Sequence, residues 1–517
     1  MTIVPTFSNE PFLDFSIETN RARQQEAIDQ VLASAGTTYP LVIGGERVMA
    51  GATFDRVNPS RKDQVLGKFQ KADGALAQKA MDAALKAYDS WKWFSAKERG
   101  LFLIRVAAIM RKKRFLLNAW MIVEEGKNWL EADGDTAEAI DFCEFYGREM
   151  IRLAEHQELT TRSGEAVELK YIPLGVGAVI PPWNFPNAIL TGMTTAAIVT
   201  GNTVVLKPAS YSPGIAYQVF LILEEAGMPP GVVNFLTGPG SIAGDVLVKH
   251  PKTRFIAFTG SMDVGLMICE NAARLSEGQI WIKRTILEMG GKDFIIVDDE
   301  ADLDSAVPQV LSAAFGFQGQ KCSACSRLIL HEKIYDRFME RFLPMVQNIK
   351  VGDPVNRDNY MGPVIAESAF KSIMRYIEIG KEQGKLLTGG NPGSDSGYFI
   401  QPTVIASSPG DTIVREEIFG PVVAVLKANS FDHAIELAND SIYGLTGAAF
   451  TRSRAKIHQA KRQLHAGNLY INRKCTGALV GVHPFGGFNM SGTDSKAGGR
   501  DYLLLFTQAK SISETFS

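Results

Sequence analysis

The stretch GAVIPPWNFPNAILTGMTTAAIVTGNTVVL, residues 177–206, decides the fold of this chain. It opens with a short apolar strand, continues with an uncharged helix-like half, and closes with the strand-like residues 203–206 after the turn signal Gly201-Asn202. Its uncharged part, 185–206, has the length of a membrane span, but threonines, asparagines and a glycine interrupt it. A buried helix that leads into a buried parallel strand is the better interpretation.

Short apolar strands alternate with helical patterns over most of the chain. The first series comprises residues 177–180, 203–206, 232–236 and 254–258. A second series follows Glu288 and comprises residues 293–297, 327–330, 421–426 and 447–450. This alternation is typical of parallel strands joined by crossover helices. The sequence therefore predicts an α/β protein of two doubly wound domains with a cleft between them.

The region before the first series reads mainly as helices. A short strand and a glycine turn at 40–47 precede long helical patterns at 75–93 and 96–125. Ser95 is a plausible start for the second helix, and the acidic residues within 133–138 offer a start for the next one.

The composition is that of an ordinary globular protein with more than one domain. The chain has 517 residues, 45% of them hydrophobic, and its 54 basic and 56 acidic residues leave a net charge of -2. A single hydrophobic core rarely serves so long a chain, and this charge balance indicates neither a nucleic acid nor a membrane partner. Five scattered cysteines and an amino terminus without a secretory signal favour a cytoplasmic location.

Cys322 is the candidate nucleophile, and Glu288 is the candidate base. Cys322 ends the segment GQKC, 319–322, next to Lys321, where a partly ionised thiol could attack a carbonyl carbon. Glu288 precedes the glycine turn of LEMGGK, 287–292, which would let its side chain change position. Taken singly, a buried apolar cysteine and a solvated carboxylate remain the alternatives.

Cys325 completes a C-x-x-C pattern with Cys322. A redox pair or half of a zinc site would share this pattern, but the sequence has no second C-x-x-C and none of its seven histidines lies close by. We predict that Cys325 is a buried neighbour without a catalytic role and that the protein needs no metal. A disulfide between the two cysteines would inactivate the protein.

Several short motifs occur in an order that typifies one enzyme family. They are PWNFP at 182–186, KPA at 207–209, FTGS at 258–261, LEMGGK at 287–292, GQKC at 319–322, EEIFGP at 416–421 and PFGGF at 484–488. Each motif alone is weak, but together they extend over most of the chain. In these motifs the chain resembles the aldehyde dehydrogenase family.

The resemblance implies a fold of two Rossmann-like domains with a small bridging β-hairpin and tail. The implied parts are an NAD(P)-binding domain at 1–157 and 173–288, a catalytic domain at 289–490, and an oligomerisation element at 158–172 and 491–517. Residues 158–171 do read as a polar alternating strand, and 503–517 as another extended run. We expect a homo-oligomer built on dimers, although an exposed edge hairpin would give the same pattern.

The resemblance also implies NAD(P)-dependent oxidation of an aldehyde through a thioester. Cys322 would attack the aldehyde carbon, while the Asn184 amide and the backbone N–H of Cys322 stabilise the oxyanion. Glu288 would then take a proton from the water that hydrolyses the thioester. Asn184 alone could instead cap a helix that begins near Pro186. A non-catalytic binding protein is disfavoured because it would need none of these three residues.

Three segments are similar to the members of the family that oxidise L-glutamate γ-semialdehyde to glutamate in proline catabolism. They are WIKR at 281–284, FGFQGQKCSA at 315–324 and NRKCTGALVG at 472–481. This resemblance implies that the α-carboxylate of the substrate binds to Ser323, Gly477 and Ala478, and that its aliphatic part lies between Phe185 and Phe485. Glycine and alanine leave backbone N–H groups unobstructed. An ordinary turn at 477–478 and a different small aldehyde as substrate remain the alternatives.

The segment GPGSIAG, 238–244, follows a predicted strand and opens a helix, as a dinucleotide-binding turn does. Its last glycine comes one residue later than in G-x-G-x-x-G, a departure that the family shares. The resemblance implies NAD as the cofactor, with Gly240 and Gly244 in this turn. It also implies contacts to the ribose hydroxyls, the pyrophosphate and the nicotinamide from Lys207, Ser261, Glu417 and Phe419.

Ser210 departs from the family pattern. Many NAD-preferring relatives have a glutamate there, whose carboxylate would repel a 2′-phosphate, and serine removes this repulsion. We therefore expect that NADP is tolerated as a second cofactor, with NAD as the default.

Overall fold

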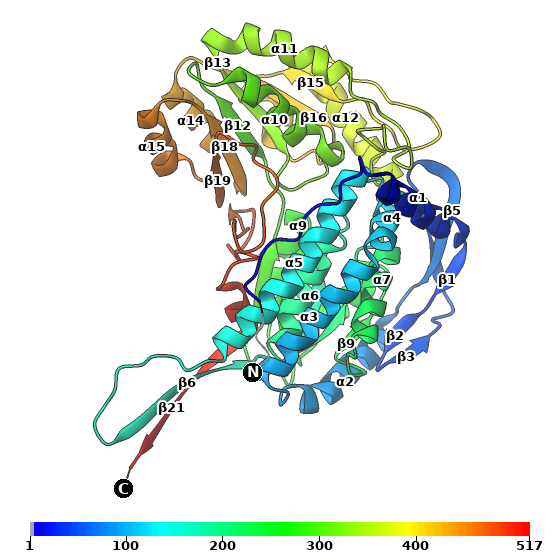
Figure 1. The fold of residues 1–517 in the computed structure, drawn as a ribbon, viewed down its shortest axis with the longest axis vertical. Coiled ribbons are helices and arrows are strands. Elements are labelled where there is room, and N and C mark those ends of the chain that lie inside the picture. The colour runs from blue at the N-terminus through cyan, green and yellow to red at the C-terminus, as the bar shows by residue number, and fades with distance from the viewer. Residues whose placement is uncertain (1–4, 517) are drawn as a thin grey trace.

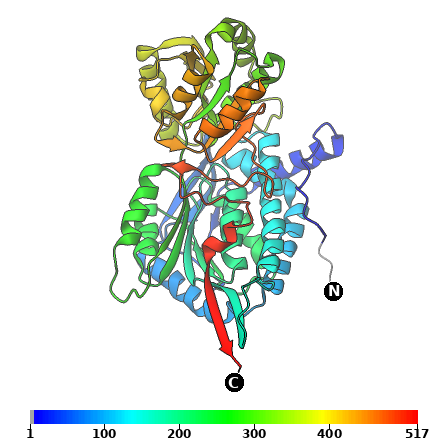
Figure 2. The ribbon, with the colours of Figure 1, turned by 90° about the vertical axis from the view of Figure 1, so that its left-hand side faces the viewer.

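The computed structural model describes residues 5–516 and contains two seven-stranded sheets (Figures 1 and 2). The strands of the first sheet are β2 (Leu41–Ile43), β3 (Glu46–Val48), β7 (Val176–Ile180), β8 (Thr203–Leu206), β9 (Val233–Phe235), β10 (Thr253–Thr259) and β11 (Arg284–Glu288). Their order is β11-β10-β7-β8-β9-β2-β3, and the pairs from β11 to β9 are parallel. The predicted first series of strands is thereby confirmed.

The stretch 177–206 forms the predicted strand, helix and strand. Between β7 and β8 lies the buried helix α6 (Ala188–Val199), which is followed by Gly201 with a φ of +94°. This left-handed conformation suits glycine because a Cβ would be strained there. Gly177 has a packing role, because a Cβ at this position would lie 2.0 Å from the ring of Phe255 in β10. The aromatic ring therefore packs directly on the backbone of β7.

Helices cover both faces of the first sheet (Figure 1). One face carries α3 (Ala96–Lys112), α4 (Arg114–Glu124), α5 (Trp129–Leu153), α6 and α7 (Pro213–Glu225). The other face carries α2 (Gly74–Trp91), α8 (Asp245–Lys249) and α9 (Met262–Ala273). A doubly wound layer results, with one apolar core on each face of the sheet.

Of the two predicted helix starts, the one at Ser95 is confirmed and the one at 133–138 is wrong. Ser95 caps α3 in a capping box with Glu98, as its position predicted. The acidic residues at 133–138 do not start a helix, because α5 begins at Trp129 and contains them. Asp133 is buried and binds the guanidinium of Arg114 through two bonds of 2.7 Å. The guanidinium of Arg114 stabilises the Asp133 carboxylate inside the protein. Asp133 therefore does not have to lie at the amino end of a helix.

The second sheet follows directly after β11. Its strands are β12 (Asp293–Val297), β13 (Cys325–His331), β14 (Lys385–Thr388), β15 (Thr403–Ala406), β16 (Val422–Ala428), β18 (Thr446–Phe450) and β19 (Asn468–Ile471). They have the order β14-β15-β16-β13-β12-β18-β19, in which β14 is the antiparallel strand. The flanking helices are α10 (Leu303–Phe315) and α11 (Tyr335–Gln347) on one face, and α12 (Glu367–Gln383), α14 (Phe431–Asn439) and α15 (Arg454–Gln463) on the other.

Smaller elements complete the molecule. Helix α1 (Glu18–Ala33) precedes a three-stranded sheet of β1 (Thr37–Tyr39), β4 (Thr53–Asn58) and β5 (Arg61–Gln70). The antiparallel strands β6 (Glu165–Pro173) and β21 (Thr507–Thr515) form a ribbon that projects from the body (Figures 1 and 2). The remaining short elements are α13 (Thr412–Arg415), β17 (Tyr443–Gly444) and β20 (Phe488–Asn489). Residues 502–506 of the predicted extended tail form a short 3-10 helix instead, and Ser517 lies outside the described residues.

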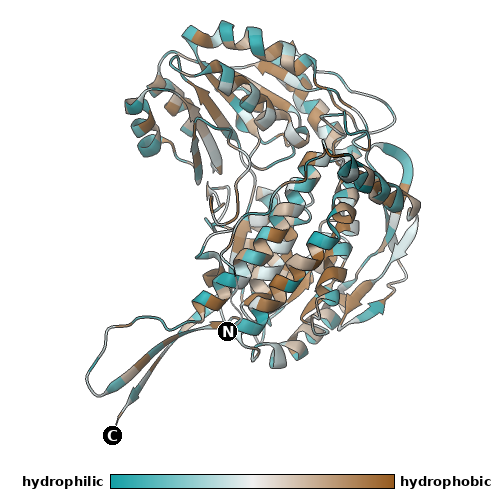
Figure 3. Ribbon diagram, in the orientation of Figure 1, coloured by the Kyte–Doolittle hydropathy of each residue, from teal (hydrophilic) through white to brown (hydrophobic). Residues whose placement is uncertain are grey.

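The apolar residues are concentrated in the sheets and on the inward sides of their helices (Figure 3). None of the helices within residues 5–516 combines the length and the apolar character that crossing a membrane requires.

Candidate active site

The carboxyl ends of the parallel strands in the first sheet carry most of the predicted site residues. Asn184 follows β7, Lys207 follows β8, Ser261 follows β10, and Glu288 is the last residue of β11. Parallel strands end at the same edge of a sheet, and a doubly wound sheet binds its ligands there. The topology therefore brings together residues that are far apart in the sequence.

Cys322 lies on a tightly held loop between α10 and β13. Phe317 and Gln318 precede it with φ values of 50° and 57°, in the left-handed region that residues with side chains seldom adopt. The side-chain nitrogen of Gln318 donates to the carbonyl oxygens of Gly126 and Pro363, both at 2.9 Å. The surrounding chain thus fixes an unusual backbone just ahead of the candidate nucleophile, as is common at active sites.

Asn184 connects the edge of the first sheet to this loop. Its side-chain nitrogen donates to the carbonyl oxygen of Gln320 at 3.1 Å. The side chain is buried, and α6 begins only after Asn187, so Asn184 is not a helix cap. The amide lies beside the segment that carries Cys322.

The ammonium of Lys321, the residue before Cys322, does not ionise the Cys322 thiol. Burial raises the pKa of Cys322 well above its ordinary value, and the nearby acids Asp293, Glu288 and Glu417 raise it further. The ammonium of Lys321 binds both carboxylate oxygens of Glu131 in α5, at 2.7 and 2.6 Å. The expectation of a partly ionised thiol beside Lys321 is therefore wrong for this resting state. The thiol is protonated at neutral pH and has to lose its proton during any reaction.

Glu288 is a partly buried acid with few partners. Its Oε1 accepts a hydrogen bond from the hydroxyl of Ser495, and its Oε2 has no partner among the described residues. Burial raises the pKa of Glu288 to about 8, although the hydrogen bonds from Ser495 oppose the shift. A carboxyl group with a pKa near neutrality can both hold and release a proton, which is what a general base requires.

The glycines after Glu288 have a packing reason. A Cβ at Gly290 would lie 2.1 Å from the carboxylate of Glu417, and one at Gly291 would lie 2.5 Å from the carbonyl oxygen of Cys322. The N–H of Gly291 also donates to Glu417 at 3.1 Å. The turn is therefore glycine-rich because two site residues, Glu417 and Cys322, approach its backbone closely.

The loop that contains Gly477 and Ala478 reaches the nucleophile segment. The thiol of Cys475 donates to the carbonyl oxygen of Ser323 at 3.3 Å, which places this loop beside Ser323. Gly477 has a φ of +77°, so the turn depends on glycine at this position. The predicted contacts of this loop with a substrate stay a prediction.

The two predicted aromatic flanks come from different elements. The Phe185 ring lies 6.5 Å from that of Phe317, and the ammonium of Lys127 lies 4.1 Å from its centroid. Phe485 exchanges backbone hydrogen bonds of 2.8 and 2.7 Å with Ala497. The residue after it, Gly486, would place a Cβ 3.1 Å from the Glu288 carboxylate.

Lys207, Gly244 and Ser210, three of the predicted cofactor residues, lie at the carboxyl edge of the first sheet. Lys207 is buried, which lowers its pKa to about 8, and its ammonium makes one long bond of 3.4 Å to the carbonyl oxygen of Pro208. A Cβ at Gly244 would lie 3.6 Å from the Lys207 side chain, and the Ser210 hydroxyl donates to Gly238 at 3.4 Å. The GPGSIAG segment forms a π-helical turn, 240–244, that leads into α8.

Ser261, Glu417 and Phe419 complete the predicted cofactor set. Ser261 is exposed at the amino end of α9, and its side chain makes no cap bond there. Burial raises the pKa of Glu417 to about 7. The ring of Phe419, a residue with a φ of 55°, lies 5.5 Å from that of Trp183.

Cys325 is buried at the start of β13, against the core of the second sheet, where its thiol lies 3.7 Å from the carbonyl oxygen of Arg327. It is a free cysteine, as is Cys322. Its placement agrees with the expected buried neighbour, and its lack of a catalytic role stays a prediction.

Two residues next to the predicted site residues were not predicted from the sequence: Ser495 and Lys127. Ser495 binds Glu288 from 207 positions away, and Lys127 makes a fully buried ion pair of 2.7 Å with Asp135 beneath Phe185. No local pattern marks such residues, because their partners come from other elements. Lys127 stands out only because it is buried, and its burial is not visible in the sequence.

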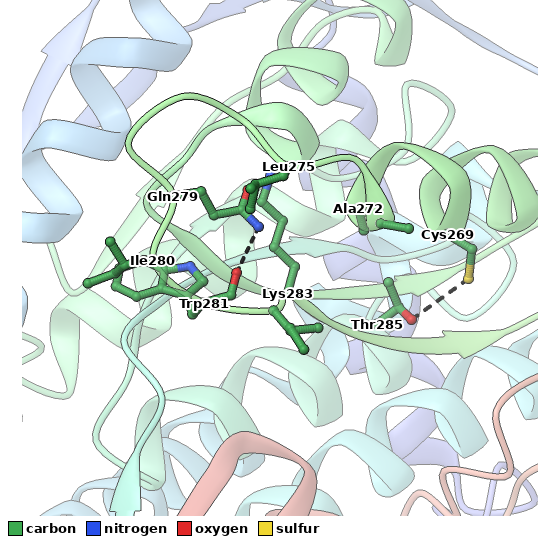
Figure 4. Close-up of a pocket in the computed structure, with 10 residues that line it drawn as sticks. Cys269, Ala272, Leu275, Gln279, Ile280, Trp281, Lys283 and Thr285 are labelled. Carbon is green, nitrogen blue, oxygen red and sulfur yellow. Dashed lines mark hydrogen bonds between the residues drawn. The ribbon is translucent and has the colours of Figure 1, made fainter.

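A cavity of about 410 Å³ lies away from all these residues, between α9 and β11 (Figure 4). Its lining is mainly apolar and includes Leu275, Ile280 and Trp281. The thiol of Cys269, which also lines it, donates a hydrogen bond to the hydroxyl of Thr285. None of the predicted catalytic or cofactor residues lines this cavity.

The chain matches known proteins over nearly its whole length. The family described as the aldehyde dehydrogenase family matches residues 48–512. A 1-pyrroline-5-carboxylate dehydrogenase of Geobacillus thermodenitrificans (strain NG80-2) is 54% identical over 515 residues, which are 99% of this chain and 100% of that relative.

Solved structures agree with this similarity. The crystal structure of a 1-pyrroline-5-carboxylate dehydrogenase from Thermus with bound NAD has a TM-score of 0.98 and 48% identity, and the match covers 100% of both chains. Proline utilization A from Bdellovibrio bacteriovorus has a TM-score of 0.97 and 45% identity, over 99% of this chain and 53% of that larger one.

Proposed function

The chain belongs to the aldehyde dehydrogenase family, and from that premise we propose that it oxidises L-glutamate γ-semialdehyde to L-glutamate with NAD in proline degradation. The semialdehyde is in equilibrium with 1-pyrroline-5-carboxylate, for which the relatives above are named. The observation that carries the proposal is the junction around Cys322. Asn184 binds the segment before this residue, and the Gly477 loop binds the residue after it.

The residues at the cofactor edge fit NAD. The buried ammonium of Lys207 has no carboxylate partner within the described residues, and a ribose hydroxyl would give it an acceptor. Ser261 stands at the amino end of α9, where free N–H groups favour a pyrophosphate. Glu417 would bind the second ribose, with Phe419 beside it. When bound, NAD supplies the acceptor for the hydride that leaves the aldehyde carbon.

Cys322 carries out the first step. Its thiol passes its proton to water, and the thiolate sulfur then bonds to the aldehyde carbon while the carbonyl oxygen becomes an oxyanion. The Asn184 amide has two N–H groups, of which one binds the carbonyl oxygen of Gln320. The second N–H and the backbone N–H of Cys322 donate to the oxyanion.

Glu288 acts in the second step. Loss of the hydride leaves a thioester on Cys322, and the Glu288 carboxylate takes a proton from the water that attacks the acyl carbon. Breaking of the carbon–sulfur bond then releases glutamate. Because the pKa of Glu288 is about 8, the active carboxylate form increases as the pH rises towards that value.

The substrate preference follows from the anion-binding loop. We assign the α-carboxylate to the Ser323 hydroxyl and the N–H groups of Gly477 and Ala478, and the aliphatic part to Phe185 and Phe485. A site built for a carboxylate rejects aldehydes that lack one, because its donors would be left unpaired.

A panel of aldehydes tests this proposal. NADH formation is measured with glutamate γ-semialdehyde, succinic semialdehyde and propanal at equal concentrations. We expect the highest kcat/KM for glutamate γ-semialdehyde. A preference for propanal would contradict the assigned substrate while leaving aldehyde oxidation intact. No NADH with any aldehyde would contradict the activity itself.

We also propose that NADP serves as a second cofactor. The Ser210 hydroxyl faces Gly238 without a carboxylate at this position, so nothing from this side chain repels a 2′-phosphate. Ser210→Glu should lower kcat/KM for NADP about tenfold or more and leave that for NAD within about threefold. A wild-type protein that is inactive with NADP would contradict the proposal.

The domain roles are proposed from the same arrangement. Residues 1–157 and 173–288 bind the cofactor, 289–490 carry the catalytic loop, and 158–172 with 491–517 mediate assembly. The ribbon of β6 and β21 supports the last role, because a two-stranded ribbon is marginally stable alone. The molar mass from light scattering should be that of a dimer or a multiple of dimers. A monomer would contradict this assignment.

A further inference from the structure

The segment after β19 folds back on itself around one side chain, that of Arg473. The guanidinium lies 4.3 Å from the centroid of the Tyr470 ring. Its Nη2 donates to the carbonyl oxygens of Thr476 and Gly477, at 3.0 and 2.8 Å. One guanidinium nitrogen therefore binds two successive carbonyl groups of the predicted substrate loop.

These two carbonyl groups belong to the peptide units whose N–H groups are predicted to bind the substrate. The oxygen of Thr476 shares a planar trans peptide with the N–H of Gly477, and the oxygen of Gly477 shares one with the N–H of Ala478. In such a unit the C=O and the N–H point in opposite directions. Binding both oxygens to Arg473 therefore directs both N–H groups away from the guanidinium, to one side of the loop.

Both N–H groups are available for a ligand. Within residues 5–516, neither the N–H of Gly477 nor that of Ala478 has an acceptor, and Gly477 is exposed. The left-handed φ of +77° at Gly477 gives the turn between the two peptide units. Donors that point to one side of a turn without internal partners are suited to an anion.

Positive charge lies behind the same loop. A Cβ at Gly477 would lie 3.7 Å from Arg473 Nη2 and 3.7 Å from Cε of Lys474, whose ammonium donates to Ser312 at 3.2 Å. A charged donor on a carbonyl oxygen polarises the peptide and strengthens its N–H as a donor. Both charges therefore favour an anion on the opposite side of the loop.

We propose that Arg473 is a positioning residue that aims the N–H groups of Gly477 and Ala478 at the substrate carboxylate and so sets the preference for a carboxylated aldehyde. The inference rests on the proposed function, which supplies the carboxylate. Arg473 does not itself touch the substrate; it acts through the two peptide units.

The test compares the wild-type protein with Arg473→Gln, Arg473→Lys and Gly477→Ala. The readout is the ratio of kcat/KM for glutamate γ-semialdehyde to kcat/KM for propanal, together with glutamate binding by calorimetry. Loss of a charge-assisted hydrogen bond should lower this ratio about tenfold or more in Arg473→Gln, mainly through KM for the semialdehyde. Glutamate binding should weaken by a similar factor.

The other variants separate positioning from folding. Arg473→Lys keeps a cation without the planar fork and should lose less than Arg473→Gln. Gly477→Ala disturbs the same peptide units while keeping the Arg473 guanidinium, and it should reproduce the loss. Arg341→Gln on α11, which breaks an exposed ion pair with Asp304, is the matched control and should keep the wild-type ratio. Thermal denaturation shows which variants are folded, and Arg473→Lys carries the test if Arg473→Gln is not.

The outcomes distinguish the two proposals. A wild-type protein that prefers the semialdehyde, with an unchanged ratio and unchanged glutamate binding in folded Arg473→Gln or Arg473→Lys, overturns the role of Arg473 alone. A wild-type protein without that preference overturns the proposed substrate, and the role of Arg473 with it.

Discussion

Two groups of charges, one on α5 and one around the end of β11, differ in whether the charges are paired. The α5 cluster consists of ion pairs: Lys127 with Asp135 at 2.7 Å, Lys321 with Glu131 at 2.6 Å, and Arg114 with Asp133 at 2.7 Å. The β11 cluster consists of Glu288, Lys292 and Asp293. In this cluster the Oε2 of Glu288, the Nζ of Lys292 and the Oδ2 of Asp293 have no hydrogen-bond partner among the described residues.

Burial and pairing act in opposite directions on the pKa values of these groups. Burial opposes ionisation of Glu131, yet Lys321 lowers its pKa below the ordinary value. In the β11 cluster the effect of burial is the largest one. Burial raises the pKa of Glu288 to about 8 and lowers that of Lys292 to about 7. In the α5 cluster pairing outweighs burial at Glu131 but not at Asp135, whose pKa burial raises despite its bond to Lys127. In the β11 cluster Glu288 and Lys292, whose free atoms have no partner, titrate near neutrality and are suited to proton transfer.

The largest expected effect comes from Cys322 itself, which is next to Lys321 of the α5 cluster and whose carbonyl oxygen approaches Gly291, beside the β11 cluster. Cys322→Ala should lower kcat by about a thousandfold or more, because no other group supplies the covalent step. Its denaturant midpoint should stay at the wild-type value, because the side chain makes no structural ion pair. The measurements are NADH formation and urea unfolding. Oxidation at the native rate would remove the basis of the proposed mechanism.

Glu288→Gln tests the chemical role of the β11 cluster. Thioester hydrolysis should slow by about a hundredfold to ten-thousandfold, the usual range for a lost general base. The first turnover should remain as a burst of NADH, since the proposed mechanism uses Glu288 only after the hydride has left. Rapid-mixing kinetics measure both phases. Equal loss of burst and steady state would place Glu288 in the first step instead.

Lys127→Met tests the structural role of the α5 cluster. It leaves the fully buried Asp135 without its cation, so the free energy of unfolding should fall by about 3–5 kcal/mol. The double variant Lys127→Met with Asp135→Asn should lose less, because no uncompensated charge remains. Denaturant unfolding compares the variants. A stability loss below about 1 kcal/mol in Lys127→Met would show that pairing is not what this cluster contributes.

The pH dependence of stability should differ in sign between the two clusters. The raised pKa of Glu288 gives a contribution that is complete below its ordinary pKa and is lost as the pH rises through about 8. The lowered pKa of Glu131 gives a contribution that is present above its ordinary pKa and is lost as the pH falls through the lowered value. Glu288→Gln should therefore flatten the alkaline side of the stability profile, and Glu131→Gln the acidic side. Thermal melts across the pH range measure both slopes, and the same slope change in both variants would contradict the comparison.

The sequence predicted elements well where short-range rules apply. The helix start at Ser95 and the turn at Gly201 occur as expected, because both depend on a few neighbouring residues. The long pattern at 96–125 instead divides at Lys113 into α3 and α4, a break that its periodicity did not reveal. The prediction of a helix start at 133–138 was wrong because the partners of these acids, such as Arg114, belong to another helix.

The sequence by itself determined the α/β class, the order of the strands along the chain and the identity of Cys322, Glu288 and Asn184 as candidate catalytic residues. Periodicity, caps and motifs are local, so one chain suffices to read them. Only the tertiary structure decided which charges are paired and which residues support the site. Lys321 meets Glu131 across 190 positions, and Ser495 meets Glu288 across 207. A pKa depends on burial and on charges that the fold brings near, and neither is written in the local sequence.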